Sequence, residues 1–268
     1  MIRNDPTPRA LPLWPLPLIA GLLPAIATLL ALALFTGEGN TPASCNPFID
    51  DCVSISRMAK HGLANQLFRA LVLPAAVFQV LTWLTAAHAF AAVGLRRRDA
   101  FALAILGVCA GVALVAYGTF LGTDGEIYRW LRRWGTLIYY AGTYFVMLIF
   151  ARSSRGLHAA QRLDLPRGHG RAMLALLAFI AGICLFHGFA SLVSAALVDR
   201  VENLTEWWGS VALTLIFLII ASLWRRWGLV VTIGLQRAGR AEVGASSFAR
   251  PISSLPLAQR AGATLPND

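Results

Sequence analysis

The chain has 268 residues, of which 57% are hydrophobic and only 13% are charged, whereas a soluble globular protein is roughly half apolar and about a quarter charged. This composition excludes an ordinary soluble domain and indicates a membrane protein. The formal net charge of +10 does not predict a nucleic-acid partner, because the basic residues are spread over four separate segments instead of one patch.

Six apolar stretches are long enough to cross a bilayer as helices, since a crossing needs about 20 apolar residues. In chain order they cover about 13–36, 67–94, 101–122, 134–151, 172–198 and 208–224. The sequence therefore predicts an all-α polytopic membrane protein, with a six-transmembrane-helix bundle over residues 1–236. The polar segment 237–268 is predicted to be a disordered cytoplasmic tail. The first stretch is longer than the apolar core of a cleaved signal peptide, about 7–15 residues, so we expect it to remain as a span.

Arginine is unevenly distributed among the segments that connect these stretches. The N-terminus, the loops after the second and fourth stretches and the segment after the sixth are rich in arginine, whereas the first and fifth loops are mixed or acidic. Because basic loops stay on the cytoplasmic side, the sequence predicts that both termini are cytoplasmic. The third loop is the exception, since Asp124 and Glu126 are accompanied there by Arg129, Arg132 and Arg133.

The ratio of arginine to lysine indicates the kind of organism that the sequence comes from. Only one of the 23 basic residues is a lysine, which is typical of a GC-rich bacterial genome. We therefore expect a multi-pass protein of the bacterial cell inner membrane, whose outer side is the periplasm.

Tryptophan positions agree with this orientation, because the amphipathic indole ring favours the membrane–water interface. The inner interface is expected to hold Trp14, Trp224 and Trp227. The outer interface is expected to hold Trp130, Trp134, Trp207 and Trp208.

The four cysteines fall into two kinds of place. Cys109 and Cys184 lie inside the third and fifth stretches, where a thiol behaves as a small apolar residue. Cys45 and Cys52 lie in the first outer loop, where a disulfide persists, so we predict a Cys45–Cys52 bridge, with two free thiols as the alternative. Neither a metal site nor a cofactor is predicted, because no histidine or third cysteine accompanies the pair and nucleotide-binding motifs are absent from the sequence.

Polar and ionisable side chains gather in the outer half of the predicted bundle. They are Arg69, Asp124, His187, Ser191, Glu202 and Glu206. His187 and Ser191 are four residues apart, as are Glu202 and Glu206, so each pair shares a helix face. An ionisable group inside a membrane needs a partner or a water-filled cavity, which makes these residues functional candidates. The structural alternative is that Arg69 pairs with Glu206 or Asp124, and that His187 bonds to a serine or tyrosine of a neighbouring helix.

The third stretch contains two small-residue repeats, Gly107-x-x-x-Gly111 and Gly118-x-x-x-Gly122. This spacing allows a second helix to approach closely. We expect the repeats to pack inside the bundle, with a homo-oligomer formed through the same face as the alternative.

Three segments resemble the Frag–DRAM–Sfk group of six-span membrane proteins. They are CVSISRMAKHG at 52–62 followed by Leu67-Phe68-Arg69, the membrane-embedded His187, and ENLTEW at 202–207. The resemblance implies a lipid-linked role without a defined catalytic mechanism. The positions that match the group are Ser54, Ser56, Arg69, His187, Glu202 and Glu206.

The leading hypothesis is a protein whose partners are membrane lipids, which it binds or organises at the outer leaflet. The headgroup would be bound by Ser54, Ser56, Arg69, Ser191 and Glu202. Arginine suits phosphate because its planar donors match the phosphate oxygens.

Two other functions stay open. In a membrane-embedded lipid hydrolase or acyltransferase, His187 would be the general base and Glu206 or Asp124 would orient it. The third hypothesis is a small transporter, although the stretches lack paired glycine or proline breaks at matching positions.

Overall fold

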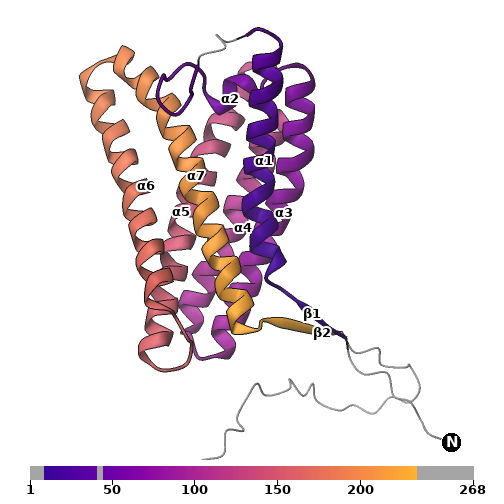
Figure 1. Ribbon diagram of the computed structural model, residues 1–268, viewed down its shortest axis with the longest axis vertical. Helices are drawn as coiled ribbons and strands as arrows, with labels where there is room; N and C mark the ends of the chain where they lie inside the picture. The colour runs from indigo at the N-terminus through magenta and orange to yellow at the C-terminus, as the bar shows by residue number, and fades with distance from the viewer. Residues whose placement is uncertain (1–8, 41–44, 234–268) are drawn as a thin grey trace, which may run out of the picture. The chain divides into compact units, whose positions relative to one another are not determined.

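The computed structural model describes residues 9–40 and 45–233. In chain order its elements are β1 (Arg9–Pro12), α1 (Pro15–Gly37), α2 (Ile55–Met58), α3 (Gly62–Ala92), α4 (Arg97–Phe120), α5 (Glu126–Ala159), α6 (Arg167–Val193), α7 (Ala195–Trp227) and β2 (Val230–Ile233) (Figure 1). The tail predicted over 237–268 lies outside the described residues.

Six helices, all except α2, are long and apolar enough to cross a membrane, and each overlaps one of the predicted stretches. The prediction of a six-span helical bundle is therefore confirmed at this level. Helix α5 extends beyond its predicted span at both ends, because the arginine-rich segments on either side of 134–151 are helical too.

The acidic fifth loop predicted around 199–207 is wrong, since these residues form the first turns of α7. Ser194 alone separates α6 from α7, and its extended backbone breaks the helix. Its hydroxyl accepts a hydrogen bond of 3.2 Å from the Leu197 N–H, which is the usual way for a serine to begin a helix. The break therefore produces a tight turn in place of a loop.

The two ends of the bundle are different (Figure 1). One end, here the loop end, carries residues 45–61 and the 121–125 turn. Asn65 of α3 joins them by donating to the Ala59 and Leu121 carbonyls. The other, here the ribbon end, carries β1 and β2, which pair antiparallel from Arg9 opposite Ile233 to Pro12 opposite Val230. The all-α prediction missed this ribbon. The two strands meet because the six long helices bring them to the same end of the bundle, and the β-branched residues of β2 favour an extended backbone.

Helix α6 lies at the edge of the bundle and packs chiefly against α7 (Figure 1). Its outward face exposes large apolar side chains, among them Leu185, Phe186, Phe189 and Leu192. Two buried clusters hold the bundle together, and α6 contributes Met173, Leu177 and Ile180 to the one nearer the ribbon end. The cluster nearer the ribbon end contains Trp83, Phe90, Phe150 and Trp224, and the one nearer the loop end contains Met58, Phe68, Leu114 and Trp207.

The first small-residue repeat packs α4 against α3. A Cβ atom added to Gly107 would overlap the Trp83 side chain, and one added to Gly111 would overlap Val80. Of the second repeat, Gly118 faces Leu73 of α3, which would lie 3.3 Å from an added Cβ atom. This face of α4 is therefore covered from within the chain.

Candidate functional site

Residues 45–61, here the docked loop, fold over the loop end of α7. A disulfide joins Cys45 to Cys52, with Cα atoms 6.3 Å apart, which confirms the predicted pairing. Side chains of α7 then hold the loop through its backbone. Asn203 donates to the Asp51 carbonyl at 2.6 Å, Trp207 to the Val53 carbonyl at 2.9 Å and Trp208 to the Phe48 carbonyl at 3.2 Å.

The two predicted serines of the docked loop have structural bonds. Ser54 begins α2, because its hydroxyl accepts from the Arg57 N–H at 3.2 Å. Ser56 donates twice to the Glu206 carboxylate, from its backbone N–H at 3.3 Å and from its hydroxyl at 3.2 Å. Glu206 is thereby fixed in position by a neutral partner.

The α4–α5 turn closes the other side of the docked loop. Gly122, at φ +84°, approaches the Lys60 carbonyl so closely that a Cβ atom would overlap it. Asn65 donates to the Ala59 and Leu121 carbonyls at 2.9 and 3.0 Å. Arg132 donates to the carbonyl of Phe120, the last residue of α4, at 3.0 Å, and to the Thr123 carbonyl in the turn that follows. The first turns of α5 therefore lie beside the docked loop.

A cleft of about 1000 Å³ lies at this end of the bundle, between the docked loop, α4, α5, α6 and α7. Its lining includes five cationic side chains: Arg57, Lys60, Arg129, Arg132 and Arg133. It includes two carboxylates, Glu202 and Glu206, and apolar residues such as Leu121, Leu137 and Val198. The cleft is thus positively charged on balance, with an apolar part of its wall.

Six of the eight predicted site residues line this cleft. They are Ser54, Ser56, His187, Ser191, Glu202 and Glu206. Arg69 and Asp124 are not among its lining residues. Arg69 sits on α3 and Asp124 in the exposed α4–α5 turn.

His187 lines the cleft, and its buried Nδ1 atom has no hydrogen-bond partner among residues 9–40 and 45–233. Ser191 donates to the Gly188 carbonyl at 2.6 Å. In the same part of the chain, no hydrogen bond joins His187 to Glu206, which is bonded to Ser56. The described residues also contain no cluster of three His, Cys, Asp or Glu side chains placed to hold a metal ion.

The cations of the cleft were missed as site residues, although the sequence carried a signal for them. Arg129, Arg132 and Arg133 made the third loop the exception to the arginine bias. Their i, i+3, i+4 spacing also places them on one face of a helix, which here is the face toward the cleft. Basic residues that depart from the arginine bias of the other loops are therefore candidates for a binding site.

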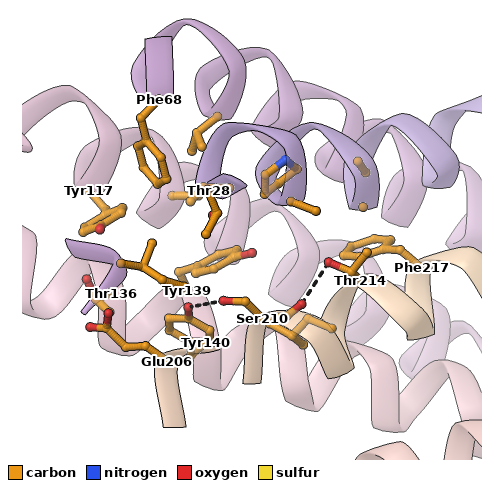
Figure 2. Close-up of a pocket in the computed structure, with 18 residues that line it drawn as sticks. Thr28, Phe68, Tyr117, Thr136, Tyr139, Tyr140, Glu206, Ser210, Thr214 and Phe217 are labelled. Carbon is orange, nitrogen blue, oxygen red and sulfur yellow. Dashed lines mark hydrogen bonds between the residues drawn. The ribbon is translucent and has the colours of Figure 1, made fainter. Parts of the chain in front are cut away.

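An internal cavity of about 70 Å³ lies deeper in the bundle, among α1, α3, α4, α5 and α7 (Figure 2). Tyr117, Thr136, Tyr140 and Glu206 line both this cavity and the cleft, so they stand between the two spaces. The Tyr140 hydroxyl lies 3.3 Å from the Ser210 hydroxyl, as the dashed line in Figure 2 marks. The cleft is therefore floored by hydroxyl groups and one carboxylate.

Comparisons with models of known protein families, with curated proteins and with solved structures found no match. The resemblance to the Frag–DRAM–Sfk group stays a prediction from the sequence. Function is inferred below from the geometry and charge of the cleft.

Proposed function

We propose that the chain binds a phosphate-bearing lipid headgroup in the loop-end cleft, and so binds or organises lipid at the outer leaflet. One observation carries the proposal. Arg57, Lys60, Arg129 and Arg133 line the cleft, and their side chains make no hydrogen bond or ion pair with another described residue. Unpaired arginines that share one cleft are suited to a phosphate, which offers several charged acceptors.

The proposal includes an orientation in which the ribbon end is cytoplasmic. Arginines at 96–98 and 225–226 belong to the ribbon end, in keeping with the positive-inside rule. The Cys45–Cys52 disulfide belongs to the loop end and suits an oxidising outer compartment. We place the protein in a bacterial inner membrane, as a relative of the Frag–DRAM–Sfk group, with the cleft at the periplasmic leaflet.

The lining of the cleft also suits a lipid better than a soluble anion. Leu137 of α5 and Val198 of α7 form apolar parts of the wall. Next to the cleft, the end of α6 exposes Phe189 and Leu192. Acyl chains attached to a headgroup in the cleft would meet this apolar surface and so remain out of water.

The test of the phosphate site is the Arg129→Gln/Arg133→Gln double variant. Each substitution removes a charged donor, a loss of about 1.5–3 kcal/mol, so we expect phosphatidylglycerol to bind at least roughly tenfold more weakly. Apparent Kd values would be measured by titrating the lipid into protein purified in detergent. Arg97→Gln/Arg98→Gln at the ribbon end removes the same charge and is expected to bind like wild type. Equal Kd values for all three proteins would overturn the proposal.

A membrane-embedded lipid hydrolase or acyltransferase is a second candidate, favoured by the unpaired Nδ1 atom of His187 in the same cleft. A general base needs hydrogen-bond reach to the proton that it removes. Binding is placed first because Glu206 is bonded to Ser56 and is not positioned to orient His187.

Mass spectrometry of the whole lipid extract separates these two functions. A deletion strain would be complemented with wild type or with His187→Ala at equal protein levels. Under the binding proposal, His187→Ala restores the wild-type lipid composition. If one lipid accumulates in the deletion strain and only wild type removes it, His187 is catalytic.

A further inference from the structure

The charges of the loop-end cleft are arranged by depth. Arg57, Arg129, Arg133 and Glu202 are exposed at its surface, whereas Lys60, Arg132 and Glu206 are half-buried. Of these charged residues Glu206 alone also lines the internal cavity, so the deepest charge in a mainly positive cleft is a carboxylate. A ligand that matches both ends carries a phosphate and, further in, a cation.

Glu206 makes no ion pair with any residue in the described part of the chain, and its hydrogen-bond donors are neutral. They are the N–H and hydroxyl of Ser56, with the backbone N–H of Ile55 beside them. A carboxylate has about four lone-pair positions, so Ser56 leaves room for further donors. Charge removed from water is costly unless it is paired, which makes a cation from a ligand the missing partner.

The groups beside Glu206 suit hydrogen-bond donors. Thr136, Tyr117 and Tyr140 stand with it between the cleft and the cavity (Figure 2). The Thr136 hydroxyl donates to the Arg132 carbonyl at 2.9 Å, so its oxygen lone pairs are left to accept. Tyrosine rings also attract cations placed over their faces.

We infer that the lipid carries a primary ammonium group beyond its phosphate, which makes it a phospholipid of the phosphoethanolamine class. The inference rests on the proposed phosphate site. The phosphate lies at Arg57, Arg129 and Arg133, and the ammonium group lies at Glu206. Its three N–H donors match the carboxylate and hydroxyl oxygens of this floor, whereas a trimethylammonium group has no N–H to donate and a glycerol headgroup has no positive charge.

The test compares lipids that have the same acyl chains. Phosphatidylethanol keeps the phosphate of phosphatidylethanolamine but has a methyl group in place of the ammonium group. We expect wild type to bind phosphatidylethanolamine about tenfold more tightly than phosphatidylethanol, the ratio that one charge-assisted hydrogen bond supplies. In Glu206→Gln this ratio is expected to fall to about one. Phosphatidylcholine should bind wild type more weakly than phosphatidylethanolamine.

Two variants separate the role of the carboxylate from its structural bond. Ser56→Ala removes the hydroxyl bond to Glu206 but keeps the charge, so its lipid preference should match wild type. Glu126→Gln removes an exposed carboxylate at the same end of the bundle that does not line the cleft, and it should also keep the preference. Thermal unfolding of each variant shows that it is folded. A loss of preference in Glu126→Gln or Ser56→Ala as large as that in Glu206→Gln would overturn the assignment.

The remaining outcomes distinguish this inference from the proposed function. If wild type binds phosphatidylethanol as tightly as phosphatidylethanolamine, or prefers phosphatidylcholine, the ammonium site is wrong and the phosphate site stands. If it binds none of these lipids, both are wrong. sn-Glycero-3-phosphoethanolamine, which lacks acyl chains, should bind at least about tenfold more weakly than the lipid. Equal affinity would overturn the assignment of a lipid ligand and indicate a soluble phosphodiester instead.

Discussion

Replacing Trp207 with alanine is expected to lower the free energy of unfolding by about 3–5 kcal/mol. The side chain is only 2% exposed, and its ring lies edge-on to Phe48, with centroids 5.1 Å apart. Its N–H also donates to the carbonyl of buried Val53, which would be left without this donor. Denaturant unfolding of the purified protein in detergent would measure the change.

The neighbouring Trp208 is a matched control for this substitution. It bonds the same docked loop through the Phe48 carbonyl at 3.2 Å, but it is 42% exposed. Trp208→Ala is therefore expected to cost roughly 1 kcal/mol, and Trp207→Phe, which keeps a ring and loses the bond, a similar amount. If Trp207→Ala costs no more than Trp208→Ala, the docked loop does not depend on Trp207.

This residue also illustrates what sequence reasoning could not reach. Trp207 and Trp224 were predicted to be interfacial anchors, but both are buried. Hydropathy and depth place a tryptophan near a membrane boundary, and they do not reveal that a loop folds over it. The contacts that bury Trp207 come from residues more than 150 positions earlier in the chain.

The spans themselves were predictable because a bilayer imposes a length and an apolar composition on every helix that crosses it. The extension of α5 was not, since four of residues 126–133 are charged and hydropathy does not include them in a span. The β1–β2 ribbon was missed because each strand has only four residues and its partner lies at the other end of the sequence.

Counting residues along the spans predicted that His187, Ser191 and Glu206 lie at a similar depth, and all three line the cleft. Residues at one depth share one layer of the bundle. The same count failed for Arg69, which lies on α3 but is not among the residues that line the cleft. The direction in which a helix turns its side chains depends on which helices it packs against, and a single sequence does not contain that information directly. Arg129 and Arg133 were missed because their charge was read as a topology signal.

Gly107→Ala is expected to destabilise the bundle by about 1–3 kcal/mol, because the added methyl group has no space. A Cβ atom there overlaps the first side-chain atoms of Trp83, which are fixed to the α3 backbone and cannot swing away. Trp83 is fully buried, so α3 and α4 would have to move apart. Unfolding in detergent measures this cost.

Gly182→Ala on α6 is the control, since nothing lies within 4 Å of an added Cβ atom there. It should leave stability unchanged or raise it by up to about 1 kcal/mol, because alanine favours a helix more than glycine does. The same pair of variants tests the alternative that the Gly107 repeat forms a homo-oligomer. A repeat that packs inside the chain loses stability in Gly107→Ala at an unchanged mass in light scattering. A repeat that joins two copies would instead lose the oligomer while the stability of each copy stayed the same.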